Sequence, residues 1–465
     1  MTEMIEKAVT ADWQIALYRK VLQDPLLEKF FALLQELTRT IPEPTQLLAS
    51  YYEFATAFIP VAADLETTDN SAWHNYICKL ILEDENLFSR QAESLEFAAI
   101  PWVVKKMAGN DLLLLQRIAN ISNKEIILLI EQRLNKVADG FFLPEWEGIR
   151  GSGTENCSAT GLEQTTPVYD IFGKEKDWAQ SLESLYAYYR QNGVGIFGQY
   201  HAFRWLRNKN GEGSLIGVRN NDKIRLSQLY GYEREQYKVV QNTEQFLAGY
   251  PANNVLLYGD RGTGKSSTVK ALVNEYGDRG LRLVEVQKQD LEDYPLIIEQ
   301  LASRPQRFII YIDDLSFTSD EGEYRALKAM LEGSLEARPS NVLIYATSNR
   351  RHLVQESFSD KNITGFHPEN EDLHFMDTVQ EKLSLADRFG ITVTFAAPAQ
   401  KGYLAIVEKL AQERGLKIEK DELAQQALRW ELNNNSRSPR TAKQFIDFLE
   451  GNLALTMRNS DRADI

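Results

Sequence analysis

One octapeptide restricts the fold of this chain more than any other part of its sequence. Residues 259–266 match the pattern GxxxxGK[ST] at every fixed position. They follow the apolar run Asn254–Tyr258 and precede the helical stretch Ser267–Tyr276. A strand, a glycine-rich loop and a helix in this order are typical of a phosphate-binding loop. A glycine-rich turn arising by chance is not expected to fill every fixed position in this context.

The residue types of the loop suit the phosphates of a nucleotide. Glycines permit backbone angles that side chains block, so the amide groups of the loop converge on the phosphates. Lys265 supplies positive charge to the β- and γ-phosphates, and the hydroxyl of Ser266 suits magnesium. The loop therefore predicts ATP and Mg²⁺ as cofactors, bound by Gly259, Asp260, Arg261, Gly262, Thr263, Gly264, Lys265, Ser266 and Ser267.

A second apolar run ends in the acids that such a site needs. Phe308–Ile312 is followed by Asp313 and Asp314, which is the Walker B pattern. Asp313 is predicted to hold magnesium, and Asp314 to orient the attacking water. Alone, two acids after a strand are often only a solvated strand end. The phosphate-binding loop upstream favours the catalytic interpretation.

Strand-like runs and helical stretches alternate beyond Asp222. This alternation predicts an α/β core at residues 221–398, built on a doubly wound parallel sheet that helices cover on both faces. After Pro398 the pattern is helical to the end, which predicts a helical C-terminal lid at 399–465. The expected strands are Val255–Tyr258, Leu283–Val286, Phe308–Ile312, Val342–Ala346 and Thr392–Phe395.

Residues 1–220 are predicted to form a mainly α-helical N-terminal domain with a partner-binding or regulatory role. Apolar residues recur there at spacings of three and four, and these stripes suit either a bundle core or a partner-binding groove. Residues 148–161, rich in Gly, Ser, Thr and Asn, predict a linker. Helical stripes occur at Leu26–Leu37, Tyr51–Phe58 and Val103–Val137, a capping box at Ser122 and Glu125, and a hairpin around Asn210-Gly211.

Charge and cysteine content narrow the classes of partner and compartment. The net charge is −14, whereas generic nucleic-acid binding leaves a basic footprint, so nucleic acid is disfavoured. Cys78 and Cys157 lack a CxxC partner, so neither a disulfide framework nor a zinc site is expected. No apolar run reaches the length of a membrane span, and the N-terminus lacks the apolar region of a secretory signal. We therefore expect a cytoplasmic protein with no membrane partner.

Together these motifs resemble the AAA+ superfamily, and more closely a family of uncharacterised bacterial AAA+ ATPases. The closer resemblance lies in PANNVLLYG at 251–259, DDLSF at 313–317 and YATSNRRHL at 345–353, and it covers roughly Ile224 to Phe448. It implies a P-loop ATPase core with a helical lid. It also implies ATP hydrolysis, self-association into a homo-oligomer, and coupling of the nucleotide cycle to remodelling or assembly of a macromolecular partner, here most simply a protein client.

The resemblance assigns roles to polar residues outside the two motifs. Asn349 occupies the position of the sensor that bonds the attacking water or the γ-phosphate. Arg388, in the segment Leu385–Gly390, takes the position of an arginine finger that reaches the nucleotide of a neighbouring subunit. An intramolecular ion pair is the alternative for Arg388.

The lid and the segment ahead of the core supply the remaining implied contacts. Ser438 suits a helix N-cap and Pro439 the first helical position, which puts Arg440 in the first turn as the second sensor. Arg437 is the competing candidate for that role. Leu229 and Tyr230 lie where AAA+ proteins build the adenine pocket.

The acid pair keeps other functions open. Many AAA+ enzymes carry Asp-Glu where this chain has Asp313-Asp314, and the shorter side chain reaches less far toward the water. Slow hydrolysis, or a nucleotide-gated interaction protein with little turnover, is therefore an alternative. The helicase-loader branch also carries Asp-Asp, so a nucleic-acid factor is a further alternative. A small-molecule kinase is disfavoured because a helical lid follows the core.

Overall fold

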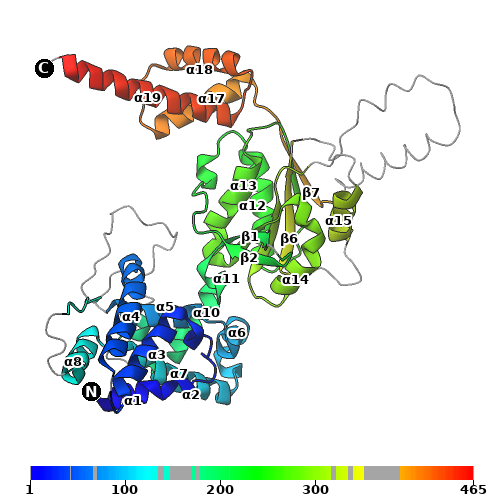
Figure 1. Ribbon diagram of the computed structural model, residues 1–465. Helices are drawn as coiled ribbons and strands as arrows, with labels where there is room; N and C mark the ends of the chain where they lie inside the picture. Colours follow the sequence, from blue (N-terminus) through cyan, green and yellow to red (C-terminus); the bar gives the residue numbers. More distant parts are fainter. Residues whose placement is uncertain are drawn as a thin grey trace, which may run out of the picture. The chain divides into compact units, whose positions relative to one another are not determined.

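The computed structural model describes residues 2–41, 43–65, 71–134, 141–146, 170–173, 177–208, 210–315, 321–332, 339–349 and 388–463 (Figure 1). Its contacts divide the chain into two compact units, Met1–Tyr200 and His201–Ile465. No helix among these residues is long and apolar enough to cross a membrane.

The first unit is built from helices. Several begin at residues that satisfy free amide groups: the Asp24 carboxylate accepts from the amides of Leu26 and Leu27 at 3.0 and 3.1 Å. The helices are α1 (Thr2–Val9), α2 (Ala11–Gln14), α3 (Pro25–Thr38), α4 (Pro44–Asp64), α5 (Ala72–Glu83), α6 (Leu87–Ser94), α7 (Trp102–Ala119), α8 (Asn123–Leu134), α10 (Leu182–Asn192) and α11 (Ile196–Gln199).

The long predicted stripe at Val103–Val137 is two helices rather than one. The predicted capping box divides it, because the Ser122 amide donates to Glu125 Oε2 at 2.9 Å and the Glu125 amide donates to Ser122 Oγ at 3.2 Å. This reciprocal pair starts α8 directly after α7 ends. The predicted linker at 148–161 lies outside the described residues.

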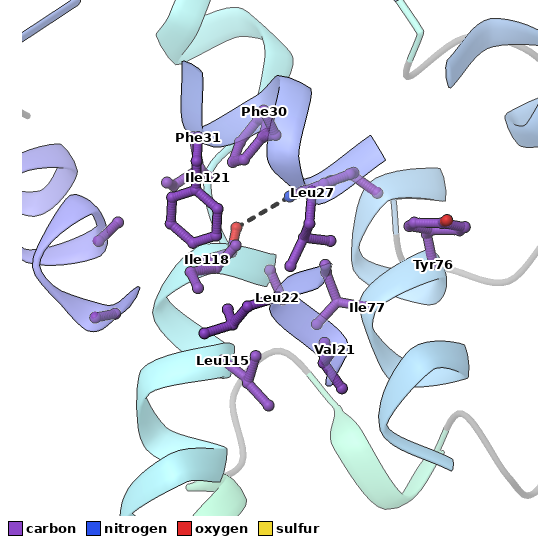
Figure 2. Packing of buried hydrophobic residues seen from close by; sticks show 14 of the residues in the cluster. Val21, Leu22, Leu27, Phe30, Phe31, Tyr76, Ile77, Leu115, Ile118 and Ile121 are labelled. Atoms are coloured by element: carbon purple, nitrogen blue, oxygen red, sulfur yellow. Dashed lines mark hydrogen bonds between the residues drawn. The ribbon is translucent and has the colours of Figure 1, made fainter. Parts of the chain in front are cut away.

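The apolar stripes of the first unit pack against one another. Leu27 of α3, Ile77 of α5 and Leu115 of α7 are fully buried and meet in one cluster (Figure 2). Aromatic rings extend this core: Trp73 lies 4.3 Å from Phe30 and 5.3 Å from Phe54, measured between ring centroids. The stripes of these helices are therefore core faces.

The second unit contains the predicted parallel sheet. Its described residues form a seven-stranded sheet in the order β2-β1-β4-β5-β6-β3-β7, parallel except for the β1–β2 pair. The strands are β1 (Ala202–Arg207), β2 (Gly213–Gly217), β3 (Val255–Gly259), β4 (Leu281–Glu285), β5 (Arg307–Ile312), β6 (Val342–Ser348) and β7 (Ile391–Phe395).

Both faces of the sheet are covered, as the predicted doubly wound fold requires. Leu257, Ile309 and Tyr345 pack into one cluster with residues of α12 (Glu233–Leu247) and α13 (Lys265–Tyr276). Side chains alternate between the faces of a strand, yet the neighbouring residues Leu256, Ile310 and Ile344 are fully buried too. Two further helices complete the core, α14 (Tyr294–Ala302) and α15 (Glu321–Glu332).

The boundary predicted at residue 220 is wrong. The predicted hairpin forms, but β1 pairs in parallel with β4, and Ala202 lies opposite Leu283. The hairpin therefore belongs to the sheet, and the two units divide after Tyr200. Sequence periodicity identified both strands but carried no information about which strand they would join.

The chain ends in three lid helices with an apolar cluster of their own. Tyr403, Leu423 and Phe445 come from different helices and are buried together. The last helix starts as predicted, because Ser438 Oγ accepts from the Thr441 amide at 3.2 Å and Pro439 is the first helical residue. The lid helices, orange to red in Figure 1, are α17 (Gln400–Glu413), α18 (Lys420–Asn434) and α19 (Pro439–Ala463).

Candidate functional site

The phosphate-binding loop joins the end of β3 to the first residue of α13. Its glycines are required by backbone angle and by space. Gly259 has φ 139°, and a Cβ there would collide with the carbonyl group of Phe395. Gly262 has φ 76°, and a Cβ there would lie 2.9 Å from Ser438 Oγ. A side chain at either position would push the loop away from β7 or from the lid.

Lys265 is held by its own loop. Its ammonium donates to the carbonyls of Gly259 and Asp260 at 2.9 and 2.7 Å, and to Asn349 Oδ1 at 3.0 Å. Burial lowers the pKa of Lys265, while the acids around it, Asp260 first, oppose that shift. An ammonium has three hydrogens, so a phosphate oxygen must replace one of these acceptors to bind it.

Ser266 and Asp313 form a pair that fits magnesium. Ser266 Oγ donates to Asp313 Oδ1 at 2.7 Å. Burial raises the pKa of Asp313, but the hydroxyls of Thr347, Tyr311 and Ser266 and the charge of Lys270 together outweigh it. The net pKa is lowered, which keeps the carboxylate charged. No group of three or more His, Cys, Asp or Glu side chains in the described part of the chain could hold a metal. One carboxylate and one hydroxyl suit Mg²⁺, which takes few protein ligands beside the phosphates.

Asn349 connects the loop to the second acid. Its side-chain oxygen accepts from Lys265, and its Nδ2 donates to Asp314 Oδ1 at 2.6 Å. Asn349 follows β6, which lies between β3 and β5 in the sheet. Asp314 is exposed, and its φ of 49° is in the left-handed region, where residues with a Cβ are uncommon. The chain Lys265–Asn349–Asp314 therefore crosses the carboxyl ends of three neighbouring strands.

The structure separates the two candidate arginines of the lid. The Arg440 amide donates to the Gly262 carbonyl at 3.2 Å, and the charge of Arg440 contributes to the lowered pKa of Lys265. Arg437 instead donates through Nε to Glu431 Oε1 at 2.7 Å, within the lid. Arg440 is thus brought to the phosphate-binding loop, whereas Arg437 is held by the lid.

Tyr230 lies against the lid. Its hydroxyl donates to Glu413 Oε2 at 3.2 Å, and Lys409 Nζ lies 5.0 Å from the centre of its ring. The carbonyl of Leu229 accepts from Gln236 Nε2 at 3.1 Å. The segment proposed for adenine therefore also joins the core to α17.

Arg388 lies near the amino ends of the parallel strands, whereas the phosphate-binding loop lies at their carboxyl ends. It sits in the turn just before β7, while Gly259 pairs with Phe395 at the end of that strand. Five strand residues separate these edges by about 17 Å, at roughly 3.3 Å per residue. The structure therefore does not bring Arg388 to the phosphate-binding loop of its own subunit. The residues just before it, 385–387, lie outside the described part.

Two residues with close contacts in the site were not given these roles by sequence reasoning. Thr347 Oγ1 donates to Asp313 Oδ1 at 2.6 Å and accepts from the Asp314 amide at 3.0 Å. Asp260, predicted only as a loop residue, accepts from the Ala397 amide at 2.6 Å and so ties the loop to the segment between β7 and α17. The only signal for Thr347 was its place two residues before Asn349, on the strand beside Asp313.

Comparison with protein families identifies the matched region. A family model described as "Protein of unknown function (DUF815)" matches residues 198–453, more than half of the chain. The chain belongs to the DUF815 family. The region shared with DUF815 holds the whole sheet, including the β1–β2 hairpin, and most of the lid. The resemblance to the AAA+ superfamily is confirmed, because this region carries the phosphate-binding loop and the Walker B acids. It also carries Asn349, which follows the strand that lies between β3 and β5 in the sheet.

Solved structures and curated proteins add little to this assignment. A single-residue mutant of RuvB from Thermotoga maritima is 16% identical, with a TM-score of 0.36, over 51% of this DUF815 chain and 67% of the RuvB chain. The RuvB Holliday junction branch migration motor of the same organism is 15% identical, with a TM-score of 0.30, over 49% and 72%. Similarity at this level says nothing about activity. No curated protein matches the chain.

Proposed function

We propose that this DUF815 protein binds ATP with Mg²⁺ and hydrolyses it to ADP and phosphate, and that the nucleotide cycle drives remodelling or assembly of a protein partner. The observation that carries the proposal is the chain Lys265–Asn349–Asp314, beside the Ser266–Asp313 pair. A nucleotide-binding loop needs the lysine and the magnesium pair. The exposed carboxylate at the end of the chain is the group that hydrolysis needs in addition.

Each residue of the site has a task that its contacts support. Lys265 exchanges a carbonyl or the Asn349 oxygen for a phosphate oxygen, and the loop amides bind the remaining phosphate charge. Ser266 and Asp313 would hold magnesium, which when bound neutralises charge on the β- and γ-phosphates. When Lys265 turns to the phosphate, Asn349 Oδ1 becomes available for the attacking water. Asp314 then orients that water, and Arg440 adds positive charge from the lid.

The position of Arg388 supports a nucleotide site that is shared between subunits. At the edge of the sheet away from its own loop, the guanidinium suits the nucleotide of a second copy better than its own. This supports a homo-oligomer in which each subunit supplies Arg388 to its neighbour. A finger of this kind contributes about 10³–10⁵-fold in rate.

A slow nucleotide switch is the second candidate function. In this structure Asn349 donates to one oxygen of the Asp314 carboxylate, which leaves the other oxygen as the one open to a water. A protein that stays in this arrangement after ATP binds would turn over slowly and act through its oligomeric state. We also propose a cytoplasmic location, in line with the free, buried thiol of Cys78.

The test is phosphate release by mixtures of two variants. Asp314→Asn removes the water-orienting acid but keeps the finger, whereas Arg388→Ala keeps the acid but removes the finger. Each variant alone is expected to lose at least about 10²-fold in rate, because each lacks one preorganised group. Mixing them is expected to restore part of the rate, since some interfaces then join an intact acid to an intact finger.

Each other result has a definite meaning. Two results together would show that Arg388 does not act in a neighbouring site. The mixtures stay inactive, and the specific activity of the unmodified chain does not change with protein concentration. Tight ATP binding without phosphate release by the unmodified chain would favour the switch. Affinity for single-stranded or duplex DNA that falls steeply with salt would favour the helicase-loader-like alternative.

A further inference from the structure

Thr347 lies between the two Walker B acids. It is on β6, is 1% exposed, and faces residues that follow β5. Its Oγ1 donates to Asp313 Oδ1 at 2.6 Å and accepts from the Asp314 amide at 3.0 Å. The main chain makes a third contact, because the Leu315 amide donates to the Thr347 carbonyl at 2.7 Å. One residue of β6 therefore contacts each of the three residues after β5.

The chemistry of these partners fixes the orientation of the hydroxyl. The Thr347 hydroxyl has one hydrogen, the ionised Asp313 carboxylate can only accept, and the Asp314 amide can only donate. The hydroxyl must therefore give its hydrogen to Asp313 and offer a lone pair to the Asp314 amide. Valine has the same shape but can do neither, while serine can do both.

The hydrogen bond from the Asp314 amide to Thr347 Oγ1 matters because of the backbone conformation of Asp314. Its φ of 49° lies in a region that residues with a Cβ seldom adopt, so surrounding contacts must hold it there. The contacts on its amide are Thr347 Oγ1 and, at 3.1 Å, Asp313 Oδ1. With this backbone angle, the Asp314 carboxylate accepts from Asn349 Nδ2 at 2.6 Å. Losing the hydroxyl removes the shorter of these two contacts.

Thr347 also lies on the strand that joins the two halves of the site. In the sheet it is directly opposite Leu257 of β3, which leads into the phosphate-binding loop. The hydroxyl therefore holds the Walker B acids from the strand that pairs with β3. We propose that Thr347 is a positioning residue that holds Asp313 for magnesium and Asp314 for the attacking water. This inference rests on the proposed ATPase function.

The test compares three variants with the unmodified full-length chain. Thr347→Val removes the hydroxyl and Thr347→Ser keeps it. Thr243→Val is the matched control: Thr243 is also fully buried, and its hydroxyl bonds Val239 O and Tyr345 Oη, both at 2.8 Å, away from the acids. Phosphate release at saturating ATP is measured together with the dissociation constant of a fluorescent ATP analogue, with magnesium and with magnesium chelated.

Thr347→Val is expected to lower the maximal rate by about 10²-fold, the cost of misplacing a reacting group. Its affinity for the analogue without magnesium stays within about twofold, but the gain in affinity on adding magnesium falls about tenfold, because Asp313 is less well held. Thr347→Ser stays within about threefold of the unmodified chain in both measurements. Thr243→Val lowers the melting temperature and keeps both the maximal rate and the magnesium effect.

Other outcomes would overturn the inference. Equal results for Thr347→Val and Thr347→Ser would show that the hydroxyl has no role. Loss of magnesium-free binding by Thr347→Val, or an equal rate loss in Thr243→Val, would mean that the hydroxyl only supports the fold. If the unmodified chain releases no phosphate, the hydrolysis proposal fails. The magnesium-linked affinity still decides the role of Thr347 in that case.

Discussion

Two sets of polar side chains, one in each unit, bond to different kinds of partner. In the first unit, Asp111 and Tyr189 bond to backbone groups. Asp111 accepts from the amides of Ala16, Leu17 and Tyr18, and Tyr189 donates to the Ile81 carbonyl at 2.6 Å. A backbone group is fixed by the fold, so such a bond has one arrangement.

At the candidate nucleotide site, several polar side chains bond to other polar side chains. Lys265, Asn349 and Asp314 form one chain, and Ser266 and Thr347 both donate to Asp313. These groups can exchange partners by rotating, so a ligand can replace one bond with another. Burial alone therefore does not mark a functional group; at this site the bonds join charged and polar side chains that a ligand can displace.

The largest expected effect is the loss of phosphate release when Lys265 at the candidate site is replaced. Lys265→Ala should lower phosphate release by about 10³-fold, because one preorganised charge at the phosphates is lost. The melting temperature should change by less than about 2 °C, since the deleted ammonium is partly desolvated and its pKa is already lowered. Phosphate release and thermal unfolding are measured beside Lys401→Ala, an exposed lid residue. A large loss of stability would show that Lys265 serves the fold as the first unit's groups do.

The reverse pattern is expected for Asp111→Ala. Removing this carboxylate leaves the amides of residues 16–18 without their acceptor, at a cost of about 3 kcal/mol. The unfolding temperature of the first unit should fall by about 6–12 °C, followed by tryptophan fluorescence, since most tryptophans of the chain lie there. Asp177→Ala, which removes an exposed cap, should cost about 1 kcal/mol.

The activity of the same variant can break the comparison. Below its unfolding temperature, Asp111→Ala should bind ATP and release phosphate at the rate of the unmodified chain. A loss of ATP affinity while the first unit stays folded would mean that this unit takes part in the nucleotide site.

The last expected effect is a pH dependence from Asp84. Burial raises the pKa of Asp84 to about 6, above its ordinary value of 3.8. Between about pH 4 and 6 the folded chain binds more protons than the unfolded chain, so stability from this group falls as pH rises through that window. The loss is about 3 kcal/mol and stays constant above pH 7.

Asp84→Asn should remove that slope, because the amide does not titrate. Urea unfolding at pH 4.5, 5.5, 6.5 and 7.5, followed by tryptophan fluorescence, gives the difference between the two chains. Parallel curves of unfolding free energy against pH for the two chains would contradict this prediction. They would show that burial does not raise the pKa of Asp84 in the folded chain.

Much of the fold was predictable because its signals are local. The strand β3, the loop after it and the first turn of α13 are adjacent in sequence, and the alternation of apolar runs with amphipathic stretches predicted the parallel sheet. The Ser122–Glu125 box and the Ser438-Pro439 helix start were predicted for the same reason: residues within one helical turn determine them.

What the sequence by itself determined was the presence of the loop, the acid pair and the alternating strands. The tertiary structure alone decided which of Arg437 and Arg440 reaches the loop, that β1 joins β4, and that Thr347 lies between Asp313 and Asp314. The physical reason is that the contacts of Arg440 with Gly262, of β1 with β4 and of Thr347 with the two acids join residues that are tens to hundreds of positions apart. They depend on strand order and register, which a local pattern of apolar and polar residues does not encode.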